Sequence, residues 1–295
     1  MKRSAFFSIF ACIMIMMVSC KSKVENVAPT LESQQIGLTN AHNARQLGGY
    51  QIGDKKVKAD LLLRTARLSE LTAEDSTLLA DKYKVQRIYD FRGEKEILAA
   101  PDVIPHGASH LALSLPFAKE EEGSKFDVKA GEERDIVKML LTYAEHPAVQ
   151  AMCTSMYDMI FFEESSQEVY RQFFADLVTL DPADGAVLWH CTQGKDRAGC
   201  ASAMLLAALG AERDLIMTDF TLSKHYYDPH IAQIETTNEA QETALTTLIS
   251  ANPAIFEATL DKVDARYGSL RDYLTECIGV TSEMMETLRE RYLEN

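Results

Sequence analysis

The feature that most constrains the fold of this chain is an apolar run that leads through a polar loop directly into a helix. The run occupies residues 186–189, the loop occupies 190–196, and the small and apolar residues 197–209 predict the helix. Similar apolar runs and helical patterns alternate earlier in the chain, and this alternation is typical of a sheet covered by helices. We therefore expect an α/β fold with a central, mostly parallel sheet flanked by helices.

Turn and capping residues predict the other elements. A Gly-Asp pair at 53–54 separates two short strands, 50–52 and 55–57, and indicates a hairpin. Thr72, followed three residues later by Asp75, indicates the start of a helix. Further strands are expected at 61–63, 85–90 and 111–115, and further helices after Asn252, Ser269 and Thr281.

Composition limits the class of protein. A chain of 295 residues with 46% apolar content can bury a sizeable core, and we see no linker that would divide residues 36–295 into independent domains. The net charge of −14 repels nucleic acid and anionic lipid surfaces at long range. An anionic ligand must therefore be held by a local basic pocket.

The first residues are typical of an export signal. Two basic residues at 2–3 precede a mostly apolar run at 5–18, which is too short for a typical membrane-spanning helix. The run ends in Val-Ser-Cys, which resembles the bacterial lipobox; an ordinary signal peptide is the alternative. We expect a signal peptide at 1–19, a lipidated Cys20, a tether at 20–35, and an exported protein anchored to a membrane, facing the periplasm or the cell surface.

Two further features are open to more than one interpretation. Residues 119–162 change to an acidic and then an amphipathic pattern, which indicates a helical insertion that is either a lid over a site or extra helices packed on the sheet. The thiols of Cys153 and Cys277 are expected to be buried and inert, and the sequence does not decide whether these two or Cys200 pair in disulfides.

The loop after the run at 186–189 carries the residues with the clearest chemistry. Cys191 and Arg197 are separated by five residues, a spacing that is weak evidence alone. Here a strand delivers the cysteine and a helix starts at the arginine, so that backbone N–H groups and the positive end of the helix converge, as in sites that bind phosphate. Such surroundings favour a nucleophilic thiolate. Arg197 can hold two phosphoryl oxygens in a fork, and Lys195 would add a second cation.

The sequence His-Cys-Thr-Gln-Gly-Lys-Asp-Arg-Ala-Gly at 190–199 resembles the signature loop of the cysteine-dependent protein tyrosine phosphatase superfamily. Further motifs are similar, in order, to a bacterial tyrosine phosphatase family within it, over residues 36–293. They are found at 43–50, 63–68, 89–92, 101–102, 267–274 and 278–281.

The resemblance implies a role for each loop residue. Cys191 would be the nucleophile, Arg197 the clamp on the phosphate, and His190 a residue that tunes the thiolate. The resemblance also implies that Lys195 and Asp196 are a loop variant found in members that act on phosphoinositides as well as phosphotyrosine. The expected phosphate-binding residues of the loop are Thr192, Gln193, Gly194, Lys195 and Ala198.

Two departures from the family pattern bear on turnover and on substrate preference. Ala198 stands where the family usually has Thr or Ser, whose hydroxyl stabilises the thiolate and aids breakdown of the phosphoenzyme. The segment Asn-Ala-Arg-Gln at 43–46 lacks the aromatic residue and the carboxylate of the usual Asn-Phe-Arg-Asp. The first departure predicts slower turnover, and the second leaves substrate preference less secure than the reaction.

Several acidic side chains are candidates for the general acid, and two arginines are candidates for cations of the pocket. Asp196 is the first choice for a general acid, Asp90 at a strand end the second, and Asp102 the third, although each could instead orient an arginine. Arg64 and Arg92 also lie at strand ends and are expected to be cations of the pocket, with paired charges as the alternative.

These residues predict an enzyme that hydrolyses phosphate monoesters, most of all protein phosphotyrosine, through a cysteinyl-phosphate. No metal or other cofactor is expected. A phosphoinositide or inositol-phosphate phosphatase is the first alternative. A phosphate-binding protein with little turnover is the second, because of Ala198. Transfer of sulfur from a persulfide is a weaker third.

Overall fold

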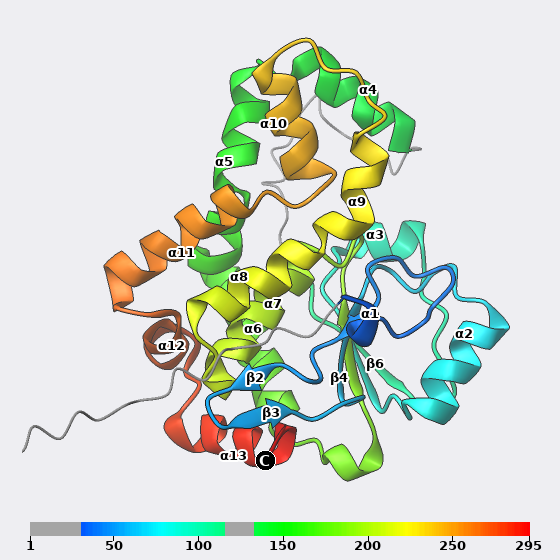
Figure 1. Ribbon diagram of the computed structural model, residues 1–295, viewed down its shortest axis with the longest axis vertical. Helices are drawn as coiled ribbons and strands as arrows, with labels where there is room; N and C mark the ends of the chain where they lie inside the picture. Colours follow the sequence, from blue (N-terminus) through cyan, green and yellow to red (C-terminus); the bar gives the residue numbers. More distant parts are fainter. Residues whose placement is uncertain (1–30, 116–132) are drawn as a thin grey trace, which may run out of the picture.

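The computed structural model describes residues 31–115 and 133–295. Its central sheet has five strands in the order β1-β4-β7-β5-β6, of which only β1 runs antiparallel to its neighbour. The α/β fold with a mostly parallel sheet is therefore confirmed (Figure 1). The strands are β1 (Arg45–Gln46), β4 (Leu62–Thr65), β5 (Arg87–Asp90), β6 (Ser109–Ala112) and β7 (Val187–His190).

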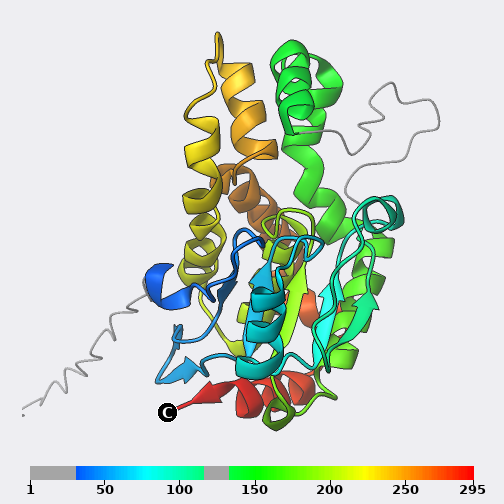
Figure 2. The same ribbon diagram turned by 90° about the vertical axis from the view of Figure 1, so that its right-hand side faces the viewer.

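Helices cover both faces of this sheet, because the apolar side chains of each central strand alternate between them. On β7, Leu188 packs on the side of η1 (Leu78–Lys82), while Val187 and Trp189 face α6 (Glu164–Leu177) and α7 (Arg197–Leu209). Figure 2 shows α2 (Ala73–Thr77), which leads into η1, on one side of the sheet. Burial on both faces is what a parallel sheet requires.

A second, three-stranded sheet closes the lower end of the molecule. The expected hairpin forms β2 (Gln51–Ile52) and β3 (Lys55–Val57), and the last strand, β8 (Leu293–Glu294), pairs with β3. The helix before it, α13 (Ser282–Tyr292), buries Leu288 in the large core on the α6 and α7 side. The chain end is thereby held against the hairpin (Figure 1).

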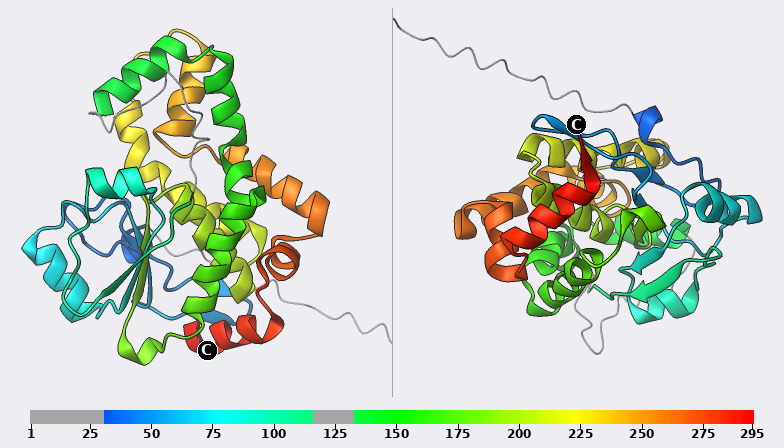
Figure 3. Two further views of the ribbon diagram at one scale, coloured as in Figure 1. Left: turned by 180° about the vertical axis from the view of Figure 1, so that it is seen from behind. Right: turned by 90° about the horizontal axis from the view of Figure 1, so that it is seen from below.

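Helices also form a lobe beyond the carboxyl ends of the strands. Its apolar contacts join Leu140, Val149 and Cys153 to Leu245 and Ile249. Figure 3 shows α5 running from this lobe down to the body of the fold. The helices of the lobe are α4 (Glu133–Tyr143), α5 (Pro147–Phe162), α9 (Lys224–Ile231) and α10 (Glu239–Leu248), and α8 (Arg213–Leu222) and α11 (Pro253–Tyr267) lie between lobe and body (Figure 1).

The remaining short elements connect these parts. They are α1 (Leu31–Gln34), α3 (Glu94–Ala99), η2 (Pro182–Asp184), α12 (Leu270–Tyr273) and η3 (Leu274–Ile278). In the described ranges no helix has both the length and the apolar character needed to cross a membrane. Cys153 and Cys200 are buried free thiols, whereas Cys277 is partly exposed, which differs from its expected burial.

Some expectations fall outside the described residues. The signal peptide at 1–19, the lipidated Cys20 and the tether as far as residue 30 belong to this group, as do residues 119–132 of the expected insertion. The described part of that insertion is helical and forms α4 and α5.

Candidate active site

The loop that contains Cys191, called here the Cys191 loop (residues 191–196), begins where β7 ends. Its neighbours on the two sides of the strand end are β4 and β5, because His190 is in register with Thr65 and with Asp90. Ligand sites of parallel sheets lie at this carboxyl edge. Cys191 is buried, and α7 begins immediately after the loop at Arg197.

The carbonyl oxygens of the loop point toward surrounding protein groups. Thr192 O accepts a hydrogen bond from the backbone N–H of Arg67 at 3.2 Å, and Gln193 O accepts one from Tyr227 Oη at 2.5 Å. Arg64 Nη2 donates to Gly194 O at 2.7 Å and to Lys195 O at 3.3 Å. Four successive carbonyls are thus turned away from the centre of the loop.

The amide groups of residues 193–196 must point the opposite way. In a planar trans peptide the N–H lies opposite the preceding C=O. None of these four amides donates a hydrogen bond to another residue within 31–115 or 133–295. Gly194 makes the tight path possible, since its φ is +64° and a Cβ there would lie 2.3 Å from Thr65 O. The loop therefore forms a concave surface of backbone donors that suits an anion.

Arg197 is held over the loop by a carboxylate from another element. Glu96 of α3 accepts from Arg197 Nη1 at 2.6 Å and from Nη2 at 2.8 Å, and its Oε1 also accepts from the Thr192 hydroxyl. Burial alone would raise the pKa of Glu96, but the hydrogen bonds from Arg197 lower it to about 2. Glu96 is therefore ionised and fixes the direction of the guanidinium.

Asp196 and Lys195 are both buried and form an ion pair at 3.0 Å. The hydroxyl of Tyr157 in α5 donates to Asp196 Oδ1 at 2.7 Å, and Lys195 Nζ donates to Thr247 O in α10 at 3.1 Å. The lobe thus contacts the loop through both side chains. The expectation that the Lys195 ammonium acts as a second cation for substrate is corrected, because it is directed at Asp196 and α10.

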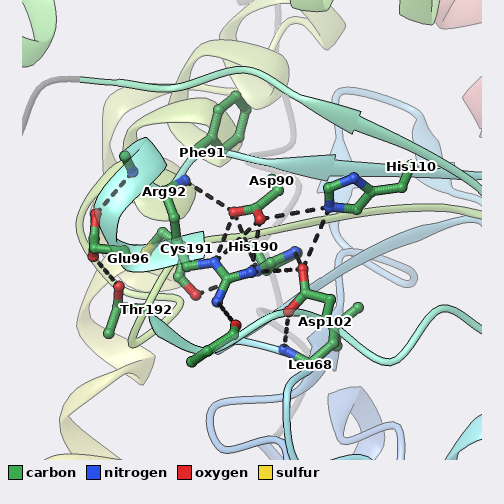
Figure 4. Close-up of polar contacts among 12 residues, drawn as sticks. Leu68, Asp90, Phe91, Arg92, Glu96, Asp102, His110, His190, Cys191 and Thr192 are labelled. Atoms are coloured by element: carbon green, nitrogen blue, oxygen red, sulfur yellow. Dashed lines mark hydrogen bonds and ion pairs between the residues drawn. The ribbon is translucent and has the colours of Figure 1, made fainter. Parts of the chain in front are cut away.

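A polar network lies beside His190, with Asp90 and Arg92 buried and His110 at its exposed end (Figure 4). Arg92 Nη2 contacts Asp90 at 2.7 Å and Asp102 at 2.8 Å, and His190 Nε2 lies 3.0 Å from Asp102. His110 Nε2 lies 3.4 Å from Asp102 and 3.5 Å from Asp90. These two carboxylates raise the pKa of His110 to about 9. The network contacts His190, the residue that precedes Cys191.

The network corrects two expectations about the pocket. Arg92 is fully buried between carboxylates, and its remaining nitrogen, Nη1, donates a hydrogen bond to Ala100 O at 2.7 Å. It is therefore not a cation of the pocket. Asp90 accepts three hydrogen bonds from the Arg92 side chain and one from its backbone N–H. Burial would raise the pKa of Asp90, but the bonds from His110 and Arg92 lower it, which disfavours a role as proton donor.

The same network contains the one group of possible metal ligands found in the described ranges. Potential ligand atoms of Asp90, Asp102, His110 and His190 lie within 4.8 Å of one another. The guanidinium of Arg92 already bridges the two carboxylates at 2.7 and 2.8 Å. A metal ion would have to share these oxygens with a fixed positive charge, so the residues fit an ion-pair network better than a metal site.

Arg64 is also a buried, paired residue and not a cation of the pocket. It lies in β4 opposite Arg45 of β1, and Asp219 of α8 contacts Arg64 Nη1 at 2.5 Å and Arg45 Nε at 3.3 Å. Burial and the nearby Arg45 lower the pKa of Arg64 to about 10, so the guanidinium remains charged at neutral pH. Its contact with the active-site region is through the loop carbonyls.

Comparison with known proteins assigns this geometry to a family. A family model described as a tyrosine phosphatase family matches residues 36–294. The chain belongs to this tyrosine phosphatase family. It is accordingly a phosphatase hydrolase.

Relatives of the phosphatase come from several bacteria. A Cupriavidus necator protein provisionally named a tyrosine-protein phosphatase is 27% identical, with 85% of each chain covered. A Nostoc commune tyrosine-protein phosphatase is 27% identical, over 80% of this chain and 75% of that protein. A Mycobacterium tuberculosis triple specificity protein phosphatase is 25% identical, over 77% of this chain and 89% of that protein.

Sequence reasoning missed several side chains around the loop of this phosphatase. Glu96 had a local signal, since it accepts a hydrogen bond from Gly93 N at 2.8 Å and closes a capping box at the start of α3, but nothing in the sequence linked it to Arg197. Tyr157, Tyr227 and Asp219 lie in helices far along the chain and carried no signal for the site.

Proposed function

We propose that the protein hydrolyses phosphate monoesters, protein phosphotyrosine above all, through a cysteinyl-phosphate on Cys191. One observation carries the proposal: a cysteine and four convergent backbone amides of one loop, and a fixed arginine at the start of the helix that follows it, lie together at the carboxyl edge of the sheet. This set supplies a nucleophile and donors for an anionic transition state.

The proposed reaction has two steps. The Cys191 thiolate attacks phosphorus, the bond from phosphorus to the leaving oxygen breaks, and Asp196 gives its proton to that oxygen. Water then attacks the phosphoenzyme, Asp196 takes a proton from the water, and the sulfur leaves as thiolate with release of inorganic phosphate. Through both steps the loop amides and Arg197 bind the phosphoryl oxygens.

Tyr157 and Lys195 fix the position of the Asp196 carboxyl group. Each binds a different oxygen of the carboxyl group, so the group is fixed in one orientation next to Arg197. Asp90 and Asp102 are bound to Arg92 and lie beside His190 (Figure 4). Of the three candidate acids, Asp196 is the one that belongs to the Cys191 loop, and we assign it as the general acid for this reason.

A substrate panel tests this function. The purified protein is assayed with phosphotyrosine peptides, phosphoserine peptides and phosphoinositides, with a chelator present throughout. We expect the highest kcat/KM for phosphotyrosine peptides, and no turnover by Cys191→Ser, since a serine hydroxyl of high pKa cannot replace the thiolate. Substantial turnover by Cys191→Ser would falsify cysteine catalysis, whereas a preference for phosphoinositides would favour the first alternative.

A second candidate function, phosphate binding with little turnover, rests on Ala198. This residue is fully buried in the first turn of α7, directly after Arg197. It therefore supplies no hydroxyl at the position where the family usually has Thr or Ser. Comparison of a single turnover with the steady state separates the two functions. Product formed once per molecule and then no further would favour a binding protein.

We also propose that the protein is exported and anchored by lipid at Cys20, on the strength of the basic, apolar and Val-Ser-Cys pattern of its first twenty residues. Metabolic labelling with a radioactive fatty acid tests this. Label is expected in the wild-type protein and absent from Cys20→Ala. Equal label in both proteins, or in neither, would contradict a lipid anchor at this residue.

A further inference from the structure

Three side chains hold successive carbonyl groups of the Cys191 loop from outside. Asn43 Nδ2 donates to Gly194 O at 2.9 Å and to Gln193 O at 3.3 Å. Tyr227 Oη donates to Gln193 O at 2.5 Å, and Arg64 Nη2 donates to the next two carbonyls at 2.7 and 3.3 Å. The donors come from three separate elements: the segment before β1, strand β4 and helix α9.

These contacts determine the direction of the amide groups. Each carbonyl shares a rigid peptide plane with the N–H of the following residue. Fixing the carbonyls of Gln193, Gly194 and Lys195 therefore fixes the N–H groups of Gly194, Lys195 and Asp196 on the opposite side. A flip of any one plane would remove a donor from the phosphate site and direct a carbonyl oxygen at the anion.

The loop needs such external contacts because its active conformation is unfavourable by itself. Amide dipoles that converge on one point repel one another, and buried N–H groups without a partner are costly. Gly194, at φ +64°, has no side chain to restrict the flip of its peptide planes. Contacts on the carbonyl side stabilise the conformation in which the amides converge.

A buried charge cluster anchors two of the three donors, Arg64 and Asn43. Asp219 pairs with both Arg45 and Arg64 and also accepts from Tyr50 Oη at 3.0 Å. Asn43 is bound to this cluster through its Oδ1, which accepts from Arg45, and through Ser223 Oγ at 3.2 Å. Two guanidinium groups share one carboxylate, so the cluster carries one excess positive charge beneath the loop, which also favours an anion there.

We propose that Asn43, Arg64 and Tyr227 are positioning residues that hold the loop carbonyls outward and thereby aim the amides of residues 194–196 at the phosphoryl oxygens. This inference rests on the proposed function, because it gives the loop amides the role of binding phosphate. None of the three side chains needs to touch the substrate.

The sharpest test removes a single hydroxyl. Tyr227→Phe deletes the donor to Gln193 O, and Tyr273→Phe is the matched control, since Tyr273 Oη donates to the backbone carbonyl of Phe161 at 2.6 Å, outside the loop. Inorganic phosphate binding is measured by calorimetry on the full chain carrying Cys191→Ser. Tyr227→Phe should weaken binding about fivefold, the change that corresponds to one net hydrogen bond of about 1 kcal/mol. Tyr273→Phe should leave the affinity unchanged.

Two more variants address the other donors. Asn43 has a φ of +54°, so Asn43→Gly removes its amide while keeping a residue that favours this backbone conformation. Arg64→Lys keeps the positive charge but not the reach to two carbonyls and Asp219. Both should weaken phosphate binding more than Tyr227→Phe does. If Arg64→Lys fails to fold, Tyr227→Phe and its control still decide.

The outcomes separate this inference from the proposed function. Weaker phosphate binding by Tyr227→Phe and Asn43→Gly, in proteins whose Tm is unchanged, supports the positioning role. If the Cys191→Ser protein binds phosphate and neither variant changes its affinity, the positioning role is overturned while the proposed function stands. If the Cys191→Ser protein binds no phosphate, both are rejected.

Discussion

Glu96 and Arg197 lie 101 positions apart in the sequence, yet both oxygens of the carboxylate bind both terminal nitrogens of the guanidinium, at 2.6 and 2.8 Å. Planar fork-to-fork pairs of this kind fix direction as well as distance. Arg197 is therefore aligned before any phosphate binds.

The first prediction concerns this pair. Glu96→Gln removes the charge that aligns Arg197 but can still accept from Gly93 N, so the cap of α3 is kept. We expect kcat/KM to fall about tenfold, as for the loss of a charged hydrogen bond of about 1.5 kcal/mol. Steady-state kinetics with an aryl phosphate measures it. Glu94→Gln, exposed on the same helix, is the control, and equal kcat/KM in the two variants would contradict an aligning role.

Ala198 gives a second prediction. If breakdown of the phosphoenzyme limits the wild type, Ala198→Ser should speed that step, because a hydroxyl near the sulfur stabilises it as leaving thiolate. Rapid-quench kinetics should show a product burst in the wild type and a smaller burst in the variant. Ala201→Ser, also buried in α7, controls for the cost of burying a hydroxyl. No burst and an unchanged kcat would show that Ala198 is not a handicap.

The pairing of His110 with Asp102 and Asp90 predicts a pH dependence of stability. Its pKa is raised from 6.5 to about 9, so the stabilisation from its charged form is fully present below pH 6.5 and is lost as the pH rises through about 9. Denaturant unfolding at pH 6.5 and 9.5 should show a smaller decrease in the free energy of unfolding for His110→Gln than for the wild type.

The control for this prediction is His106→Gln. The side chain of His106 is exposed and forms no ion pair within the described ranges of the chain. This variant should retain the full decrease in the free energy of unfolding between the two pH values. An equal decrease in the wild type and in His110→Gln would contradict the assigned pairing.

Local signals in the sequence predicted much of the fold correctly. The turn at 53–54 lies in the hairpin of β2 and β3, Thr72 and Asp75 form the expected capping box, and Asn252 caps α11. These features depend on residues close together in the chain, where side chain and backbone interact whatever surrounds them. The run at 186–189 likewise predicted β7 and the loop that follows it.

Features that depend on distant partners were not predicted. Arg64 was assigned to the pocket from its strand end, but its side chain lies on the same face of the sheet as Leu62, beneath the loop, where Asp219, 155 positions later, binds it. The strand expected at 111–115 is β6 at 109–112, an edge strand with mostly exposed residues and therefore little apolar pattern. Burial and pairing of this kind appear only with the complete fold.

The last prediction identifies the general acid. If Asp196 protonates the leaving oxygen, Asp196→Asn should lower kcat strongly for a phosphoserine peptide, whose alkoxide is a poor leaving group, and only mildly for an aryl phosphate whose phenolate leaves without help. The substitution keeps an oxygen for the Tyr157 hydroxyl, so the side chain can stay in place. Kinetics over a series of leaving groups gives the slope of log kcat against leaving-group pKa.

Asp90→Asn is the matched comparison, because Asp90 is bound to Arg92 and should not transfer a proton. Its loss disturbs the network beside His190, so it should lower activity by a similar factor for every leaving group. A steep slope for Asp196→Asn with a flat one for Asp90→Asn supports the assignment. The reverse pattern would make Asp90 the acid. Loss of a carboxylate that only orients an arginine weakens phosphate stabilisation to the same extent for every leaving group.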